Sequence, residues 1–549
     1  MKPGAISIGT YLADVEVTLA DLARRDVMKR MWREDHTVWK PGPAEISNRL
    51  GWLTVSGLMQ KQTAALEAFA SEVREAGFRH VVLLGMGGSS LGAEVLRQVF
   101  GSAKGYPELI VLDSTVPASV QKVAATIDPA KTLFLVSSKS GTTAEPLALF
   151  HYFRVLVESA VGRGKTGQNF VAITDPGTPL TGLAVESGFR RIFLNRPDIG
   201  GRYSVLSYFG LVPAALIGVN IKELLKRALG MQKKCAANVI LNKNPGAWLG
   251  ACISTLTQKG RDKLTLITSP AVSSFGLWVE QLVAESTGKE GEGVIPVAGE
   301  PLVAPQHYGN DRFFIYLRLE NDNNSATDAA VERLRSAGQP VVTYQMRDKH
   351  DLGAEFFRWE FATAVAGAIL GIHPFDQPNV QEAKDATEKL LQKYVKSGHL
   401  PQAETTGYLA DLMGKAKKKD RYLAIMAYVV QTPEIDAALA DLRRKVLERY
   451  HTATTLGYGP RFLHSTGQLH KGGPNKGLFI QITTEHQTDL PIPGKPYTFG
   501  ILADAQALGD YQALRSLRRH IIKVHFRRGD EAAIANLLAG LWKQLEPVQ

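Results

Sequence analysis

The stretch HVVLLGMGGSSLG, residues 80–92, decides how the first part of the chain folds. Its opening apolar run, His80–Leu84, predicts a buried strand, because a continuous rather than alternating run suits a strand covered on both faces. The strand ends in a loop made almost entirely of glycine and serine, and a helical pattern follows. A loop without bulky side chains lets a ligand approach the backbone. The stretch therefore predicts a strand–loop–helix unit whose loop binds something.

Short apolar runs recur along the chain, each followed by a loop and a helical pattern. This alternation predicts doubly wound, flavodoxin-like parallel sheets with helices on both faces. The pattern restarts near residue 263 and again after a polar, lysine-rich break at Lys393–Asp420. The further strands that we expect are Leu109–Leu112, Thr132–Val136, Phe170–Thr174 and Arg191–Leu194, then Lys263–Ser269, 293–299, Arg312–Leu319 and Pro340–Met346, and finally 422–429, 477–484, 497–503 and 520–526.

The expected fold class is α/β, with two doubly wound parallel-sheet domains and a smaller C-terminal α/β domain. A length of 549 residues suits roughly three or four domains. We expect a helical N-terminal segment at 1–60, a first α/β domain at 61–230, a second at 231–400 and a C-terminal domain at 401–549.

The composition is that of an ordinary globular protein, with 44% hydrophobic and 21% charged residues. No apolar run is long enough to span a membrane, so we expect no membrane partner. The N-terminus carries acids and lacks a long apolar segment, so it is not a secretory signal. The two cysteines, Cys235 and Cys252, form neither a disulfide framework nor a zinc cluster. A reducing cytoplasm is the expected location.

The net charge of +11 suits either nucleic acid or an anionic metabolite. The densest basic run, GKAKKKDR at 414–421, holds no aromatic residue and lies in a polar stretch. A solvated linker is the better interpretation of that run. We therefore expect no nucleic-acid partner.

Glycine and hydroxyl residues follow two of the predicted strands. Gly87, Gly88 and Ser89 precede a helix, whose free N–H groups and positive end favour an anion. A dinucleotide is the rival ligand, with Asp113 holding a ribose hydroxyl, but its fingerprint requires a third glycine where Ser90 stands. The second loop, SSKSGTT at 137–143, has no use in binding a pyrophosphate, whereas its hydroxyls can wrap a terminal phosphate.

Helix capping is the competing explanation for these hydroxyls, but one such residue suffices for a cap. We therefore favour a phosphate site at the carboxyl edge of the first sheet. Its expected residues are Gly87, Gly88, Ser89, Ser138, Lys139, Ser140, Thr142 and Thr143.

Five motifs together resemble the glucose-6-phosphate isomerase family of the sugar isomerase (SIS) fold. They are GMGGSSLG at 85–92, SSKSGTTAE at 137–145, GGRYSVLSYFGLVPAAL at 200–216, QLVAESTGKEG at 281–291 and HPFDQPNVQEAK at 373–384. The resemblance covers about residues 45–395. The part after about residue 400, especially GPRFLHSTGQLHKGGPNKG at 459–477, resembles the end of the isomerase half of fused transaldolase–isomerase proteins.

The resemblance implies two SIS-type domains and an aldose–ketose isomerase of glycolysis and gluconeogenesis. Such an enzyme interconverts glucose 6-phosphate and fructose 6-phosphate through a cis-enediol. The resemblance implies no cofactor and no metal, a sugar phosphate as the bound partner, and a homodimer. A dual glucose/mannose phosphate isomerase and a non-catalytic sugar-phosphate sensor remain alternatives.

The resemblance also assigns the catalytic residues. Glu285 matches the carboxylate that moves the proton between C1 and C2. Arg202 follows Gly200 and Gly201, which allow close backbone approach, and Gly201 is an expected substrate-binding residue. The positive charge of Arg202 can stabilise the enediolate. Gln281, one helical turn before Glu285 and on the same face, matches a residue that contacts the substrate.

Ring opening is assigned to His307, which lies twenty-two residues after Glu285, and to Lys384. His373 is a nearby competitor for the histidine role. Pro378 predicts the start of the helix that carries Lys384. A polar, glycine-bracketed loop near the C-terminus either closes over the active site or is only structural, and the sequence does not decide between the two. Its polar residues are His464, Ser465, Thr466, His470 and Lys471.

Overall fold

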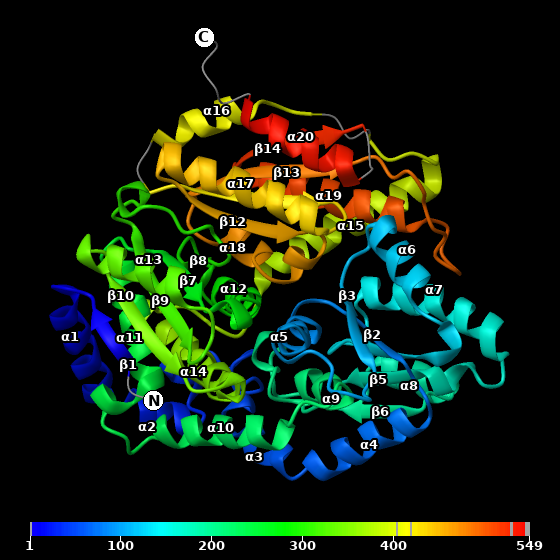
Figure 1. Ribbon diagram of the computed structural model, residues 1–549, viewed down its shortest axis with the longest axis horizontal. Helices are drawn as coiled ribbons and strands as arrows, with labels where there is room; N and C mark the ends of the chain where they lie inside the picture. Colours follow the sequence, from blue (N-terminus) through cyan, green and yellow to red (C-terminus); the bar gives the residue numbers. More distant parts are fainter. Residues whose placement is uncertain (1–2, 402–404, 418–419, 528–530, 544–549) are drawn as a thin grey trace.

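Three sheets, each with its own helices, organise the chain (Figure 1). The computed structural model describes residues 3–401, 405–417, 420–527 and 531–543. The mixed α/β class and the parallel sheets expected from the sequence are confirmed. The four domain ranges stay a prediction.

The first sheet has the strand order β3-β2-β4-β5-β6 and is parallel throughout. This is the flavodoxin-like order, and its central strands are buried apolar runs, as expected. The strands are β2 (His80–Gly85), β3 (Glu108–Leu112), β4 (Thr132–Ser137), β5 (Phe170–Thr174) and β6 (Arg191–Leu194), and the helices are α4 (Thr63–Glu75), α5 (Leu91–Phe100), α6 (Pro117–Thr126), α7 (Ala144–Val161), α8 (Pro179–Glu186) and α9 (Tyr208–Leu216).

The second sheet has the order β1-β10-β9-β7-β8, in which β1 is the one antiparallel strand among those described. The N-terminal segment is thus not purely helical, because its first residues pair with β10. The strands are β1 (Pro3–Ser7), β7 (Lys263–Thr268), β8 (Ile295–Val297), β9 (Arg312–Leu319) and β10 (Val341–Met346), and the helices are α1 (Tyr11–Arg24), α2 (Val27–Trp32), α3 (Trp52–Gln60), α10 (Ile221–Lys234), α11 (Pro245–Gln258), α12 (Phe275–Thr287), α13 (Ser325–Ser336) and α14 (Leu352–Leu370).

The third sheet has the order β12-β11-β13-β14 and is also parallel. The strand expected at 497–503 is wrong, because Thr498 caps a helix there by accepting a hydrogen bond from Ile501 N. The strands are β11 (Tyr422–Tyr428), β12 (Ala453–Tyr458), β13 (Gly477–Thr484) and β14 (His520–Phe526), and the helices are α15 (Pro378–Ser397), α16 (Leu409–Gly414), α17 (Pro433–Tyr450), α18 (Gly467–Gly472), α19 (Phe499–Ser516) and α20 (Glu531–Lys543).

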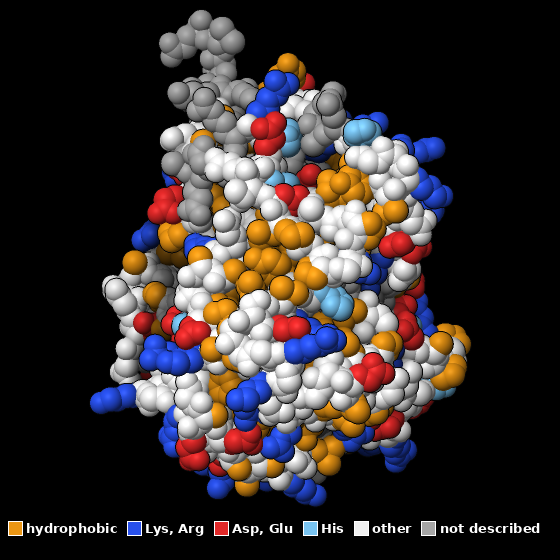
Figure 2. Space-filling model, turned by 90° about the vertical axis from the view of Figure 1, so that its right-hand side faces the viewer, with side chains coloured by type: hydrophobic (Ala, Val, Ile, Leu, Met, Phe, Trp, Pro, Cys, Tyr) orange, Lys and Arg blue, Asp and Glu red, His pale blue; other side chains and the backbone are white. Residues whose placement is uncertain are grey.

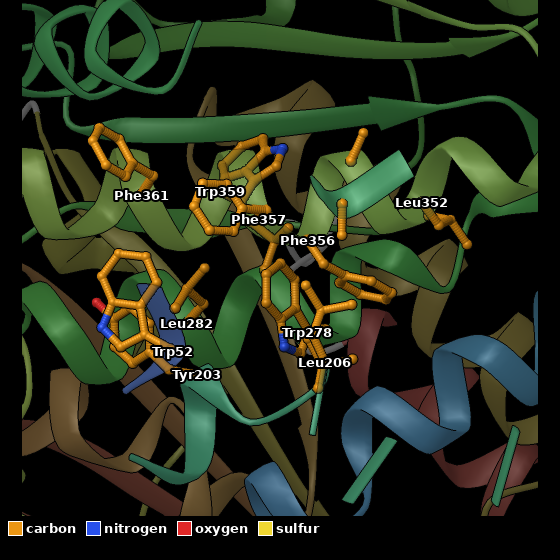
Figure 3. Packing of buried hydrophobic residues seen from close by; sticks show 14 of the residues in the cluster. Trp52, Tyr203, Leu206, Trp278, Leu282, Leu352, Phe356, Phe357, Trp359 and Phe361 are labelled. Atoms are coloured by element: carbon orange, nitrogen blue, oxygen red, sulfur yellow. The ribbon is translucent and has the colours of Figure 1, made fainter. Parts of the chain in front are cut away.

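Each sheet with its helices forms one unit. An aromatic core joins the first two units (Figure 3). The Trp52 ring lies 5.2 Å from the Tyr203 ring, and Trp278 packs edge-on against Phe356 at 4.9 Å. Such pairs prefer tilted and edge-to-face geometries. Trp278 lies on α12, and Tyr203 follows Arg202 in the chain. The core therefore fixes the two segments on which the motif residues lie.

The third unit packs against both others through apolar contacts. Phe499 and Leu502 of α19 join the core on one face of the first sheet. Tyr422 and Phe479 of the third sheet cluster with Ala284 of α12. Burial of apolar surface on two sides therefore holds the third unit in place.

The surface carries charges of both signs. Basic and acidic side chains are interspersed on the face that Figure 2 shows. Within the described residues, no helix combines the length and apolarity needed to cross a membrane. Of the basic run at 414–421, residues 418–419 lie outside the described part.

Candidate active site

The two glycine- and hydroxyl-rich loops lie side by side at one edge of the first sheet. They follow the neighbouring strands β2 and β4, whose last residues, Gly85 and Ser137, lie opposite each other. In this strand order the junction is the switch point at which open α/β sheets bind ligands. The Ser137 hydroxyl donates to the Ser89 carbonyl oxygen at 2.9 Å and joins the two loops.

The hydroxyls of the second loop are paired with one another. Ser138 Oγ lies 3.0 Å from Thr143 Oγ1, and Ser140 Oγ lies 2.9 Å from Thr142 Oγ1. The loop leads into α7, whose N-terminus favours an anion. Lys139, in contrast, turns away from these hydroxyls: its ammonium pairs with Asp175 at the end of β5.

The glycines of the first loop permit close contacts with other segments. A Cβ atom on Gly88 would lie 2.1 Å from the Gly201 carbonyl oxygen, and one on Gly87 would lie 2.5 Å from the His464 carbonyl oxygen. Gly87 also has a φ of +54°, which disfavours other residues. The loop therefore touches the Arg202 segment on one side and the third unit on the other.

Arg202 is 3% exposed and its guanidinium is held rigidly. Nε donates to Ser286 Oγ at 2.9 Å, and Nη2 donates to the carbonyl oxygens of Pro374 and Asp376, both at 2.8 Å. Nη1 donates to Gln377 Oε1 at 3.0 Å. These bonds fix the direction of its charge before any ligand arrives.

Glu285 lies beside this guanidinium near the end of α12. Its Oε1 is 3.3 Å from Arg202 Nη1. Its Oε2 accepts a hydrogen bond from Gln281 Nε2 at 3.1 Å, so the two α12 side chains share a face as expected. The Gln281 amide also donates to the His464 carbonyl oxygen at 2.8 Å. Gln281 thus connects the carboxylate to the third unit.

Lys289 is a buried cation that the sequence did not single out. Its Nζ lies 2.6 Å from Asp376 Oδ1 and 2.5 Å from the His373 carbonyl oxygen. Burial, together with the nearby Arg202 charge, lowers the pKa of Lys289 to about 7. This lysine supports the turn that holds Arg202.

A second carboxylate, Glu145, lies at the start of α7 next to the hydroxyl loop. Its Oε1 is 2.8 Å from His464 Nε2 and 2.7 Å from Gln506 Nε2, both from the third unit. Burial alone would raise the pKa of Glu145, but His464 and the charge of Lys384 outweigh it and lower that pKa below its usual value. The carboxylate is therefore ionised.

Lys384 lies on the helix predicted for it. α15 begins at Pro378, and the Lys384 side chain is exposed two turns further on. Its charge reaches Glu145, the carboxylate that His464 contacts.

The two histidines considered for ring opening are both engaged in other contacts. His307 Nδ1 is 2.9 Å from the Glu448 carbonyl oxygen at the end of α17, and its ring stacks on His451. His373 uses both ring nitrogens: Nδ1 accepts from Phe375 N, and Nε2 lies 3.0 Å from the Ala44 carbonyl oxygen. Within one chain these contacts do not bring His307 to the Arg202–Glu285 pair, and its ring-opening role stays a prediction.

Asp113 ends β3, where a dinucleotide would place its ribose. Its carboxylate is instead engaged by Arg461, whose Nε and Nη2 donate at 2.7 and 2.8 Å. Such a two-bond contact is strong and directional. Asp113 therefore anchors the third unit.

One group of carboxylates has the spacing of a metal site. Asp262, Asp311 and Asp420 offer oxygens within 4.8 Å of one another. The Lys263 ammonium, however, lies 2.7, 3.2 and 2.5 Å from the three carboxylates. The lysine charge occupies the position that a cation would take.

Sequence reasoning did not select Glu145 or Lys289, and it left the His464 loop undecided. Glu145 is the last residue of SSKSGTTAE, and the sequence alone assigns it no role. A buried acid directly after a hydroxyl loop is the signal that could have found it. Its partner His464 lies 319 residues away, so no local pattern connects them.

Comparison with known proteins finds similarity to glucose-6-phosphate isomerases. The family model for phosphoglucose isomerase matches residues 58–294. A glucose-6-phosphate isomerase from Carboxydothermus hydrogenoformans is 29% identical over 399 residues, which cover 62% of this chain and 85% of that protein. One from Staphylococcus haemolyticus is 27% identical, over 67% of this chain and 92% of that protein.

Two solved structures share the fold. A hypothetical protein from Thermus thermophilus has a TM-score of 0.59 at 24% identity and covers 70% of this chain and 99% of that chain. A glucose-6-phosphate isomerase from Chlamydia trachomatis has a TM-score of 0.59 at 18% identity and covers 69% of this chain and 86% of that chain. In the motifs, the family match and the two relatives taken together, the chain is similar to the phosphoglucose isomerase family.

Proposed function

We propose that the protein is an aldose–ketose isomerase that interconverts glucose 6-phosphate and fructose 6-phosphate. The observation that carries the proposal is the buried Arg202–Glu285 pair, which lies against the glycine loop of the first sheet. A proton-transfer carboxylate, a fixed cation and an anion-binding edge are the groups that this reaction needs.

In the proposed mechanism the phosphate is held by the two loops. Gly87, Gly88 and Ser89 approach it with their backbone, and Ser138, Ser140, Thr142 and Thr143 turn their hydroxyls from one another to its oxygens. Binding energy from this remote group positions the sugar carbons. The contact of Gly88 with Gly201 supports a short path from the phosphate to Arg202.

Glu285 then takes the proton from C2 of the open sugar and returns it to C1. The electrons form the enediolate, whose negative oxygen is stabilised by Arg202 and Gln281. Because the guanidinium is already hydrogen-bonded on all sides, little reorganisation accompanies the reaction. Lys384 is the exposed cation that is proposed to assist ring opening.

The test is isomerisation of glucose 6-phosphate deuterated at C2. We expect fructose 6-phosphate, with the label either at C1 or exchanged into solvent. Binding without conversion would favour a sugar-phosphate sensor and overturn the proposal. Conversion of mannose 6-phosphate at a similar rate would show the dual isomerase instead.

Two further expectations belong to this proposal. Both cysteines are buried and free of disulfide bonds, and burial raises the pKa of each thiol to about 12, which suits a reducing cytoplasm. A homodimer stays a prediction, for which sedimentation of the full chain is the measurement.

A further inference from the structure

One turn of the third unit packs against the glycine loop of the first unit and reaches Glu145, just after the hydroxyl loop. A 3₁₀ turn, Arg461–His464, follows β12 and contacts the glycine loop of the first sheet. In Figure 1 the third unit lies over the junction of the other two, with α18 and α15 beneath its sheet. The polar loop that the sequence left without a role is therefore at the candidate active site.

Both the side chain and the backbone of His464 are hydrogen-bonded. Its ring nitrogen Nε2 lies 2.8 Å from Glu145, and its carbonyl oxygen accepts from Gln281, whose amide also holds Glu285. The side chain keeps 14% of its surface exposed. Within the described residues, Nδ1 has no hydrogen-bond partner, so this nitrogen is free to exchange a proton with a ligand.

A histidine held by an ionised carboxylate is a suitable acid–base group. The carboxylate orients the ring, selects the tautomer with a proton on Nε2 and stabilises the imidazolium that forms when Nδ1 takes up a proton. The lowered pKa of Glu145 keeps that carboxylate charged. Gln506, donating to the same oxygen, holds the carboxylate in place.

We infer that His464 opens the sugar ring and that the third unit supplies it within the same chain. The inference rests on the proposed isomerase function. In the step, Nδ1 takes the proton of the C1 hydroxyl and returns it to the ring oxygen as the C1–O5 bond breaks and the C1 carbonyl forms. The proton count is unchanged, and no other reactant is needed.

The contacts that dock the third unit explain how one chain can complete the site. Arg461 holds Asp113, and Gln468 Nε2 donates to the Gly288 carbonyl oxygen at 3.0 Å, just beyond α12. Arg443 donates to the carbonyl oxygens of Ala298 and Gly299, both at 2.9 Å. Together with the buried apolar contacts they fix the His464 turn on its own chain.

The first test compares His464→Gln with His307→Gln. We expect the His464 variant to lose about a hundred- to a thousand-fold in turnover of the cyclic sugar, as for removal of an acid–base group. It should also lose one limb of its pH–rate profile, while deuterium exchange on open-chain substrate persists. His307→Gln should match the native protein in all three.

Chemical rescue distinguishes a catalytic role of His464 from a purely structural one. Added imidazole should restore part of the turnover of His464→Ala, because a free imidazole can carry the proton but cannot clamp the loop. No rescue, together with an unchanged pH profile in His464→Gln, would overturn the catalytic assignment. A native protein that fails to isomerise at all would overturn the proposed function and this inference with it.

The second test mixes two inactive variants, Glu285→Gln and His464→Gln, after joint unfolding and refolding. If both residues act within one chain, the mixture stays inactive. If neighbouring chains shared them, hybrid dimers would recover about a quarter of the native activity. Recovery of that size would overturn the single-chain arrangement, and refolded native protein is the control.

Discussion

The four parallel strands of the second sheet repeat the order of four strands of the first, but the two sheets differ at their switch points. In the first sheet, Ser138 pairs with the Thr143 hydroxyl, and Ser140 pairs with the Thr142 hydroxyl and accepts from Thr142 N at 3.3 Å. A ligand can replace these contacts within the loop. In the second, Ser269 Oγ donates to Asn324 Oδ1 at 2.5 Å and accepts from Leu319 N at 2.7 Å. The second edge thus satisfies its polar groups internally. Topology creates both edges, but only side chains make one of them a binding site.

The second and third sheets contribute through other elements. The second supplies Glu285 from the end of α12, the helix after β7. The third has the buried apolar residues Val429 and Val430 after its first strand, and supplies His464 from the turn after its edge strand β12. The three units therefore contribute different groups to the candidate site. Each group can be tested against a matched position elsewhere in the fold.

The largest effect is expected from Glu285→Gln. The isostere cannot accept the C2 proton, so kcat should fall by about a hundred- to ten-thousand-fold. Binding of 6-phosphogluconate should persist, because the lost interaction belongs to the transition state. Steady-state kinetics and solvent deuterium exchange measure the change.

Glu280 on the same helix is the control. Burial raises its pKa to about 8, so its carboxyl is largely neutral at pH 7 and resembles an amide. Glu280→Gln should leave turnover unchanged. Equal losses in both variants would mean that the end of α12 is not the special position.

The next effect concerns the two switch points. Ser140→Asp places a negative charge in the first loop and should weaken binding of 6-phosphogluconate by about 100-fold, or about 3 kcal/mol. Ser273→Asp makes the same change in the exposed loop after β7 and should alter the dissociation constant by less than about twofold. Calorimetric titration distinguishes them. A phosphate site at the second edge would reverse the order.

A smaller effect is expected on α15. Lys384→Met removes the cation whose charge reaches Glu145. Turnover of the cyclic sugar should fall by about tenfold, with less effect on proton exchange of open-chain substrate. Lys389→Met, an exposed neighbour on the same helix, should be neutral. If both lysines behave alike, the ring-opening role of Lys384 is wrong.

The smallest effect is a pH dependence of stability at Lys289. Its pKa is lowered to about 7 by burial, from 10.5, so between these values the unfolded chain binds more protons than the folded one. The free energy of unfolding therefore rises with pH in that window. From pH 7 to pH 8 the native protein should gain about 1 kcal/mol more than Lys289→Met does. Urea unfolding at both values measures the difference, and parallel curves would contradict the lowered pKa.

Local patterns predicted the first sheet and its loops. Continuous apolar runs such as His80–Leu84 have no competing helical period, and glycine and serine mark their ends. Strand order, and hence the adjacency of the two loops, followed from the general rule for doubly wound sheets. The helix start at Pro378 was equally local, since proline favours the first turn.

Longer-range features escaped prediction. β1 and β12 were missed because short segments with glycine, PGAIS and ATTLGY, become strands only through their partners β10 and β11. The 497–503 segment has strand-like residues, but the cap of Thr498 and apolar packing on the first unit make it helical. His464 and Glu145 meet only because the third unit docks, so no local spacing in the sequence connects them.

The pairing of β1 with β10 has a consequence for how the chain is made. During synthesis, Pro3–Ser7 emerges well before β7, β9 and β10, the strands whose sheet it closes. Until those strands are complete, both the edge of β10 and the waiting N-terminal segment expose unpaired backbone groups. The last step in forming the second unit therefore joins a segment made early to strands made much later. Its folding cannot proceed in simple order from the N-terminus to the C-terminus.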